Sequence, residues 1–311
     1  MTWTVLAFYA FTPLADPPAQ KARLTAVLGD LGACGTVLLA PEGVNGTLAL
    51  PADRAATAET LLRALPGCAA MEIKRSAAAA RPFRRLKVRL KREIVTLGAP
   101  EADPARGVGT YVAPADWNAL IAAPEVAVID TRNAYEVRLG SFRGAIDPGT
   151  ARFRDFPAWW DAQAGRLAGR PVAMFCTGGI RCEKATSLLK ARGLGEVFHL
   201  QGGILKYLET VPAVESLWHG SCFVFDRRVA LGHGLAPAPA HLCHGCRRPL
   251  LPQDLEKVEY EEGVSCHLCW REHSAADRAR FRQRHRQMQR AAGAAARAGA
   301  PLATASAAHA E

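Results

Sequence analysis

Short apolar runs and helical patterns follow one another over the first part of the chain. Three runs are apolar enough, over a short enough length, to predict strands: residues 3–11, 36–40 and 48–50. Two other stretches carry their leucines and valines at helical spacing: residues 18–31 and 53–65. This order of strands and helices is typical of a small ferredoxin-like sandwich. We therefore expect an α+β domain of that type over residues 1–97.

A further strand, within residues 81–92, alternates apolar and basic side chains. Leu86, Val88 and Leu90 share one face, so the opposite face of the strand is wholly basic. Charge of this kind also guards the exposed edges of sheets. The stripe contains so few acids that we favour contacts with nucleic-acid phosphates. The residues expected to bind RNA are Arg84, Arg85, Lys87, Arg89, Lys91 and Arg92.

Residues 41–47, Pro-Glu-Gly-Val-Asn-Gly-Thr, are rich in turn-forming residues. The polar side chains of Glu42 and Asn45 are of types that often contact a ligand. An Asn-Gly pair is also a common signature of a hairpin turn. Composition favours the turn, and the role of Glu42 and Asn45 stays open.

A second region begins after a Pro- and Gly-rich linker over residues 98–110. Buried strands are predicted at residues 126–130, 171–175 and 197–200. Helices are predicted at residues 114–121, 183–192 and 205–209. This alternation implies a doubly wound parallel sheet over residues 111–216. Such folds place their sites at the carboxyl ends of the strands.

The run Cys-Thr-Gly-Gly-Ile-Arg at residues 176–181 follows one of these strands and leads into a helix. Its glycines let the loop curl so that backbone amides point inward. Those amides, the helix N-terminus and Arg181 favour an anion at the centre, so Cys176 should ionise readily to its nucleophilic form. We expect Cys176 and Arg181 to be catalytic. The other loop members are Thr177, Gly178, Gly179 and Ile180.

Three interpretations of this loop compete. A buried structural cysteine is the usual case, but it does not explain the Gly-Gly and Arg spacing. A protein-tyrosine phosphatase loop is one residue longer between its Cys and Arg, which leaves room for a phosphate. The four intervening residues here suit a single sulfur atom carried as a persulfide. A loop of this length resembles the active-site loop of a rhodanese domain. Residues 130–136 and 140–146 also match sequence patterns of that family.

Three further residues are expected to support the loop. Asp130 and Arg132 have the spacing of an ion pair that fixes the neighbouring segment, although both residue types also act in catalysis. Cys182 directly follows the loop and is a secondary candidate for resolving a persulfide as a disulfide. Neighbouring residues at the start of a helix rarely face each other, which counts against that role.

Two Cys-x-x-Cys pairs lie in the segment that we assign to residues 217–273: Cys243 with Cys246, and Cys266 with Cys269. Nineteen residues separate the pairs, a spacing typical of four-thiolate zinc sites. Zinc would replace the core that so short a segment lacks. The alternative is redox-active thiols, and the spacing favours structural zinc.

Residues 274–311 begin as an arginine-rich helix and continue, from residue 291, as an Ala/Gly/Ser tail that we expect to be disordered. The helix contains few large apolar residues, which favours contact with nucleic acid over a place in a core. A solvated helical face would have the same composition.

Composition narrows the class of protein. The 311 residues carry a formal net charge of +10, which favours a polyanionic partner. No apolar run is long enough to cross a membrane, and the N-terminus lacks the features of a signal peptide. Nine cysteines with two Cys-x-x-Cys pairs are typical of metal or thiol use in a reducing compartment, so we expect a cytoplasmic protein.

Several motifs together resemble the bacterial rhodanese-domain tRNA uridine hydroxylases, from residue 1 to about residue 270. The motifs are the turn at 41–47, Lys-Arg-Glu-Ile-Val-Thr-Leu-Gly at 91–98, the loop and helix start at 176–185, and Gly-Ser-Cys-Phe-Val-Phe-Asp at 220–226. The resemblance implies oxygen-dependent 5-hydroxylation of the wobble uridine in tRNA. It makes Cys176 the active residue, as a persulfide. Ser221 stands where the family usually has Glu, which is a minor departure.

The residues and the resemblance agree on an activated cysteine and a polyanionic substrate. We identify no flavin, haem or iron-site motif, so no organic cofactor is predicted, and molecular oxygen enters only through the resemblance. Two other functions stay open. One is a sulfurtransferase that passes persulfide sulfur to tRNA or a protein acceptor. The other is a zinc-stabilised RNA adaptor with a vestigial loop. The oligomeric state is not predicted.

Overall fold

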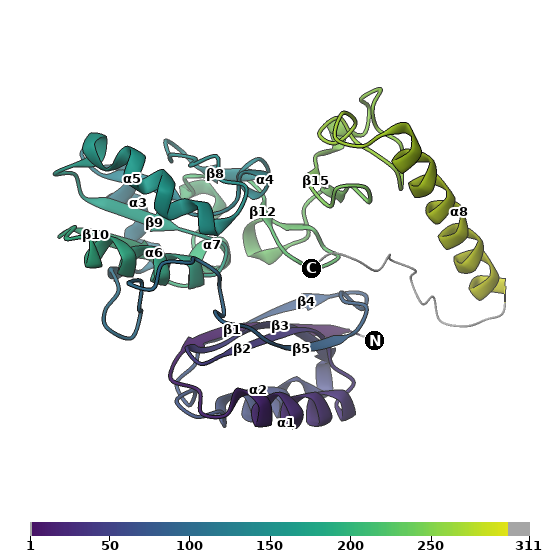
Figure 1. The fold of residues 1–311 in the computed structure, drawn as a ribbon, viewed down its shortest axis with the longest axis horizontal. Helices are drawn as coiled ribbons and strands as arrows, with labels where there is room; N and C mark the ends of the chain where they lie inside the picture. The colour runs from purple at the N-terminus through teal and green to yellow at the C-terminus, as the bar shows by residue number, and fades with distance from the viewer. Residues whose placement is uncertain (1, 298–311) are drawn as a thin grey trace. The chain divides into compact units, whose positions relative to one another are not determined.

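The computed structural model describes residues 2–297, which form two compact units (Figure 1). The first unit ends at Ala238 and contains two layered modules, and the second begins at Pro239. We expected the cysteine-rich segment to begin at residue 217, so the boundary lies later than predicted. Residues 217–238 belong to the first unit because Trp218 and Cys222 are buried in its core.

The N-terminal module is a five-stranded sheet with two helices. Its strands are β1 (Trp3–Phe11), β2 (Cys34–Ala40), β3 (Gly43–Pro51), β4 (Ile73–Ala78) and β5 (Leu86–Leu90). Its helices are α1 (Pro17–Asp30) and α2 (Ala55–Arg63), and a 3₁₀ turn, Ala52–Arg54, precedes α2. The strand order is β4-β1-β3-β2-β5, antiparallel except for the parallel β2–β5 pair. The first four strands and two helices confirm the predicted ferredoxin-like fold.

The two faces of this sheet have different surroundings. Helices α1 and α2 lie on one face, where Leu24 and Leu62 join a buried cluster with Leu6 of β1 (Figure 1). Side chains alternate along a strand, so Ala7 and Tyr9 of β1 point to the opposite face. That second face is the one that meets the other module of the same unit, as described below.

The hairpin between β2 and β3 is tighter than predicted. We expected a turn over residues 41–47 with an Asn-Gly tip, but β2 ends at Ala40 and β3 begins at Gly43. The prediction of an Asn-Gly turn is therefore wrong. Gly43 has φ +144°, and a Cβ atom there would lie 2.0 Å from the carbonyl oxygen of Ala10. Glycine thus permits close pairing with β1, and Asn45 lies inside β3 opposite Tyr9.

The second module is built on a four-stranded parallel sheet of order β6-β10-β9-β7, which confirms the predicted fold. Its strands are β6 (Thr110–Val112), β7 (Ala127–Asp130), β9 (Val172–Phe175) and β10 (Val197–Leu200). Its helices are α3 (Pro114–Ala122), α4 (Ala134–Val137), α5 (Phe156–Leu167), α6 (Ile180–Ala191) and α7 (Gly203–Thr210).

Alternation along β7 and β9 explains why both faces of this sheet are covered. Ile129 and Met174 pack with residues of α5 and α6 on one face. Val128 and Phe175, each one residue away, pack with residues of α3 and α7 on the other. Strands buried on both faces are apolar throughout, which is why these runs stand out in the sequence. The loop after β9 is thereby held at the carboxyl edge of the sheet.

Short elements complete the first unit. Strand β8 (Gly140–Phe142) pairs with β11 (Trp218–Gly220), and β12 (Cys222–Phe223) pairs with β13 (Ala230–Leu231). Three 3₁₀ turns lie at Phe153–Asp155, Ala213–Glu215 and His233–Leu235.

The second unit consists of a two-stranded ribbon, turns and one long helix. The ribbon pairs β14 (His241–Leu242) with β15 (Pro249–Leu250), a 3₁₀ turn follows at Pro252–Asp254, and α8 spans Ala275–Arg297. The Ser274 hydroxyl accepts a hydrogen bond from the Asp277 backbone amide at 3.1 Å, which caps α8. The helix continues past residue 291, where we expected the tail to begin, and residues 298–311 lie outside the described residues.

Over residues 2–297, none of the helices is both long enough and apolar enough to span a membrane.

Candidate active site

Cys176 follows the last residue of β9 and begins the loop that leads into α6. The backbone amide of Gly179 donates a hydrogen bond to Cys176 Sγ at 3.1 Å. Gly179 has φ +106°, a conformation that side chains rarely adopt, and it is the residue before the first turn of α6. The start of α7 holds the loop from the other side, because the amide of Ile204 donates to the Cys176 carbonyl at 2.9 Å. The loop therefore curls around the sulfur, as the sequence predicts.

The environment of Cys176 favours the thiolate. Burial by itself raises the pKa of this thiol. Four interactions outweigh that effect and lower the pKa to about 5. They are a hydrogen bond with the Cys182 thiol, the positive charge of Arg181, and hydrogen bonds from the backbone amides of Cys182 and Gly179. Cys176 is thus ionised at neutral pH.

Cys182 faces Cys176, contrary to our expectation for neighbouring residues at a helix start. Its thiol is fully buried, forms a hydrogen bond with Cys176 and lies 3.5 Å from the Thr131 hydroxyl. The loop turns back on itself between the two cysteines, so the third residue of α6 comes to lie beneath the first residue of the loop. Burial raises the pKa of the Cys182 thiol, which therefore remains a proton donor to the Cys176 thiolate.

Arg181 is held by a carboxylate that the sequence analysis did not single out. Its guanidinium donates to the two carboxylate oxygens of Glu136 at 2.6 and 2.8 Å, and to the Thr177 hydroxyl at 3.2 Å. Glu136 belongs to α4 and is buried. Burial tends to raise the pKa of Glu136, but the charge of Arg181 holds it below its usual range. A buried arginine requires a carboxylate partner. This requirement could have directed attention to an acid such as Glu136 from the sequence.

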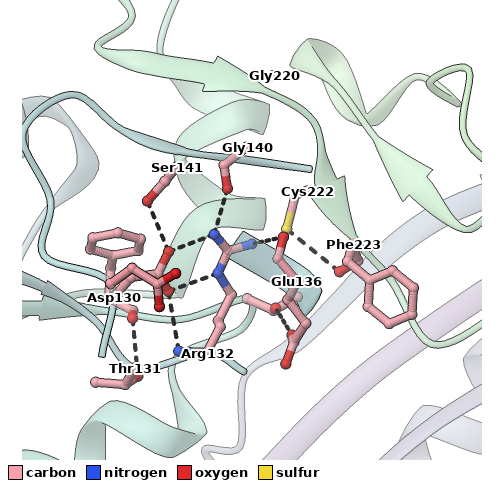
Figure 2. Close-up of polar contacts among 12 residues, drawn as sticks. Asp130, Thr131, Arg132, Glu136, Gly140, Ser141, Gly220, Cys222 and Phe223 are labelled. Carbon is pink, nitrogen blue, oxygen red and sulfur yellow. Dashed lines mark hydrogen bonds and ion pairs between the residues drawn. The ribbon is translucent and has the colours of Figure 1, made fainter. Parts of the chain in front are cut away.

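Asp130 and Arg132 form a buried ion pair (Figure 2). Arg132 Nη2 lies 2.6 Å from Asp130 Oδ2 and donates to the Gly140 carbonyl at 2.6 Å. The Ser141 hydroxyl donates to the same aspartate at 2.9 Å. The guanidinium also lies over the Trp218 ring at 5.1 Å. Arg132 Nη1 also donates to the Glu136 carbonyl of α4 at 3.5 Å, so these contacts fasten β8 and α4 to the end of β7.

Cys222 lies beside this network in Figure 2, and the sequence analysis gave it no role. Burial raises the pKa of its thiol to about 12, so it is a neutral core residue. The neighbouring Ser221 contributes its backbone amide, which donates to the Leu139 carbonyl at 2.9 Å. That contact does not depend on the side chain, and the minor effect of Ser221 stays a prediction.

A cavity of about 550 Å³ opens onto the cysteine loop. The loop residues at its wall are Cys176, Thr177, Gly178, Ile180 and Arg181. The second face of the N-terminal sheet forms another wall, with Tyr9, Asn45 and Lys74 among its members. Apolar side chains, including Phe83, Phe153 and Phe225, complete it. The site is therefore shared between the two modules of the first unit.

Two side chains of the N-terminal module touch the loop region directly, and no local pattern in the sequence points to either. The Tyr9 hydroxyl donates to the Glu183 carboxylate at 2.8 Å. The Lys74 ammonium donates to the Gly178 carbonyl at 3.0 Å and lies 5.6 Å from the centroid of the Tyr9 ring. These contacts join positions more than 100 residues apart.

Glu42 and Asn45 hold the segment that follows β5. Asn45 donates to the Ile94 carbonyl at 2.9 Å, and the Ile94 amide donates to Glu42 at 2.6 Å. Lys184 of α6 pairs with Glu42 at 2.8 Å and with Glu93 at 2.6 Å. The two residues thus connect the N-terminal module to the helix that follows the cysteine loop.

The predicted basic face lies on the cavity side of the N-terminal sheet. Thr36 and Leu38 of β2 line the cavity, and the parallel register places Lys87 and Arg89 beside them. Lys91 itself lines the cavity. Arg84, Arg85 and Arg92 are exposed in the segments that flank β5. The structure therefore brings Lys91 to the cysteine cavity and places Lys87 and Arg89 on the same sheet face.

The four cysteines of the second unit converge on one point. The sulfurs of Cys243, Cys246, Cys266 and Cys269 all lie within 4.8 Å of one another. The Cys243–Cys269, Cys246–Cys266 and Cys266–Cys269 sulfur pairs are 3.9, 3.8 and 3.7 Å apart. A tetrahedral ion with metal–sulfur bonds of about 2.3 Å requires sulfur separations of about 3.8 Å, so the cluster fits zinc.

Several arginines of α8 are engaged within the second unit. Arg278 lies 4.2 Å from the Trp270 ring, Arg282 pairs with Glu261, and Arg284 donates to the His244 carbonyl at 3.0 Å. One side of α8 therefore packs on the cysteine-rich segment. This differs from our expectation of a helix that serves mainly to contact nucleic acid.

Comparisons with known proteins agree with this division of the chain. The family model described as a UPF0176 acylphosphatase-like domain matches residues 3–94. The model of the rhodanese-like domain matches residues 113–210.

Curated relatives cover most of the chain. A protein of Jannaschia sp. named tRNA uridine(34) hydroxylase is 58% identical, over 91% of this chain and 93% of that protein. The protein of the same name from Roseobacter denitrificans is 54% identical, over 90% of this chain and 95% of its own length. Among solved structures, a rhodanese-related protein from Thermoplasma volcanium is 24% identical, covers 33% of this chain and 93% of its own, and has a TM-score of 0.28.

Proposed function

Because this chain belongs to the family of tRNA uridine(34) hydroxylases, we propose that it hydroxylates C5 of uridine 34 in tRNA, with Cys176 as its active-site residue. The observation that carries the proposal is the 58% identity to the Jannaschia protein across 91% of the chain. The intact cysteine loop supports it, because its sulfur is held as an anion at the wall of a cavity of about 550 Å³. A cavity of that size accepts a nucleotide turned out of its strand.

Cys176 acts in this proposal as the nucleophilic sulfur, either as the thiolate or with a second sulfur as the persulfide. The amides of the loop hold the anion. Arg181 acts through its charge, while its Nη1 and Nη2 groups donate to Glu136 and Thr177. Asp130 and Arg132 fix the position of α4, and hence of Glu136.

tRNA is the substrate in this proposal, and the reaction takes place in the cytoplasm. The basic side chains on the cavity side of β5 support it, because phosphate contacts along that face lead toward Cys176. Lys91 would bind nearest the cavity, with Lys87 and Arg89 farther along the same face. Arg84, Arg85 and Arg92 would add to the positive electrostatic potential around this face, which attracts the tRNA.

Two further components belong to the proposal. Zinc would be held by Cys243, Cys246, Cys266 and Cys269, where it supplies structural stability to the second unit. Molecular oxygen is the co-substrate, as the family resemblance implies.

Sulfur transfer is a second candidate function, and one observation favours it. The Cys182 thiol is hydrogen-bonded to Cys176, so a sulfur carried on Cys176 lies beside a second thiol. Transfer of sulfur to tRNA or to a protein would use the same loop.

The two functions are separated by one comparison of products. The purified protein is incubated with tRNA from cells that lack it, in extract of those cells, with and without oxygen. Oxygen-dependent 5-hydroxyuridine, measured by nucleoside mass spectrometry, supports the hydroxylase. Two other results would contradict the hydroxylase and support a sulfurtransferase. One is thiolated tRNA, and the other is rapid transfer of sulfur from thiosulfate to cyanide without any 5-hydroxyuridine.

A further inference from the structure

The Tyr9 hydroxyl lies between the cavity and a buried acid. Tyr9 is at the wall of the cavity that contains Cys176, and its hydroxyl donates to Glu183 at 2.8 Å. A Cβ atom on Gly179 would lie 2.7 Å from the Tyr9 oxygen, so that oxygen sits directly over the cysteine loop. Glu183 is the fourth residue of α6 and has only 9% of its surface exposed.

The groups that face Glu183 come from four places in the fold. They are Tyr9 of β1, Lys74 of β4, Tyr111 of β6 and Cys176 of the loop. Tyr9 and Tyr111 both form hydrogen bonds with its carboxylate, and Lys74 supplies the positive charge. Burial, the largest influence, raises the pKa of Glu183. A buried carboxylate with two hydroxyl donors is suited to accepting a proton through one of them.

Hydroxylation at C5 requires such an acceptor. When C5 of uracil gives the electron pair of the C5–C6 double bond to an electrophilic oxygen atom, a C5–O bond forms and C6 is left short of an electron pair, so the C5–H bond must break. The electron pair of that bond returns to the ring and restores the C5–C6 double bond, and the hydrogen leaves as a proton. Cys176 is already used as the nucleophilic sulfur of the proposed function, and Arg181 has no basic atom, so a second group must accept this proton.

We propose that Tyr9 and Glu183 form the proton relay of this site. The Tyr9 oxygen accepts the proton from C5 while its own hydroxyl proton passes to the Glu183 carboxylate. One C–H bond breaks, one O–H bond forms on Tyr9, and the carboxylate becomes neutral. Lys74 keeps the loop in place through the Gly178 carbonyl. This inference rests on the proposed function and assigns the N-terminal module a part in its chemistry.

The chain contains a matched control for Tyr9. Tyr111 also forms a hydrogen bond with Glu183, but Tyr111 is not part of the cavity wall. Replacing either tyrosine by Phe removes one hydroxyl donor from the same carboxylate. Only Tyr9→Phe removes the hydroxyl that faces the substrate. A purely structural role would therefore affect the two variants alike.

The experiment compares wild type, Tyr9→Phe and Tyr111→Phe on tRNA made with ordinary or 5-deuterated uridine, in aerobic extract of cells lacking the protein. We expect Tyr9→Phe to lower the rate of 5-hydroxyuridine formation by about 100-fold, the usual contribution of a general base. The deuterated tRNA should then react more slowly than ordinary tRNA, because breaking the C5–H bond has become limiting. Tyr111→Phe should lower the rate much less than Tyr9→Phe and show no added isotope effect, because it leaves the Tyr9–Glu183 contact in place.

A second variant covers the case in which Tyr9→Phe fails to fold. Glu183→Gln keeps an acceptor for the Tyr9 hydroxyl but cannot take up a proton, so it should show the same rate loss and isotope effect. Equal activity of Tyr9→Phe and wild type, or equal losses in both tyrosine variants without an isotope effect, would overturn the relay while leaving the hydroxylase intact. A wild-type protein that forms no 5-hydroxyuridine would overturn the proposed function itself, and the relay with it.

Discussion

The guanidinium of Arg181 and the carboxylate of Glu136 form a two-point ion pair inside the protein, with distances of 2.6 and 2.8 Å. The side chains retain only 9% and 0% of their exposed surface. The pair joins α6, the helix that begins at the cysteine loop, to α4. Helix α4 follows β7, the strand that lies beside β9 in the sheet. It keeps a positive charge beside Cys176.

Glu136→Gln should destabilise the protein. It leaves the charge of Arg181 buried without a partner, and breaking a buried pair in this way costs about 3–5 kcal/mol. Urea unfolding of the purified variant measures the loss. Asp103→Asn is the matched control, because its partner Arg106 is 88% exposed and the pair is worth no more than about 1 kcal/mol. Equal stability of the two variants would contradict the account of Glu136.

The reactivity of Cys176 should follow its lowered pKa. The thiolate is the form that reacts, so alkylation of Cys176 should fall as the pH drops through about 5 and be constant above that range. Cys182→Ala removes a donor to the anion, so the midpoint should move to higher pH. Cys68→Ala, in the core of the N-terminal module, should leave it unchanged. Peptide-resolved mass spectrometry after iodoacetamide treatment measures each midpoint, and a midpoint near 9 in wild type would contradict the account.

The sequence predicted the elements whose pattern is local. Strands β1 and β10 begin and end where their apolar runs do, and the cysteine loop is recognisable because its residues are contiguous. The parts of the site that escaped prediction depend on distant pairs. Tyr9 and Glu183 are 174 positions apart, and the contact between them leaves no periodic signal in either segment. The Asn-Gly pair at residues 45–46 suggested a turn, but both residues lie inside β3, where a Cβ atom on Gly46 would come within 2.7 Å of the Phe8 ring.

Substitutions on the cavity face of β5 should weaken tRNA binding. Replacing Lys87, Arg89 and Lys91 by Ala removes three phosphate contacts, and each contact contributes about 0.7–0.9 to the slope of log affinity against log salt. The slope should therefore become shallower by about 2–3. Filter binding across a salt series measures it. Arg63→Ala is the control, since Arg63 is exposed on α2, which covers the opposite sheet face. An unchanged slope in the triple variant would place the tRNA elsewhere.

Removal of the metal should unfold the second unit. The unit is stabilised by the four cysteines around one point, so a strong chelator or Cys266→Ser should abolish its folded structure. Elemental analysis should find one zinc per chain, and cobalt in its place should give the absorption spectrum of a tetrahedral thiolate site. Loss of helical circular dichroism on chelation reports the effect on α8. A metal-free protein that keeps this signal would favour redox thiols instead.

We propose above that this chain hydroxylates uridine 34 of tRNA with Cys176 as the active-site residue. The most direct test is nucleoside mass spectrometry of total tRNA from cells that lack the protein, complemented with wild type or with Cys176→Ser. We expect 5-hydroxyuridine and its derivatives to disappear from the deficient cells and to return only with the wild-type protein. Full recovery with Cys176→Ser would contradict the assigned active-site residue, and unchanged tRNA in the deficient cells would contradict the function.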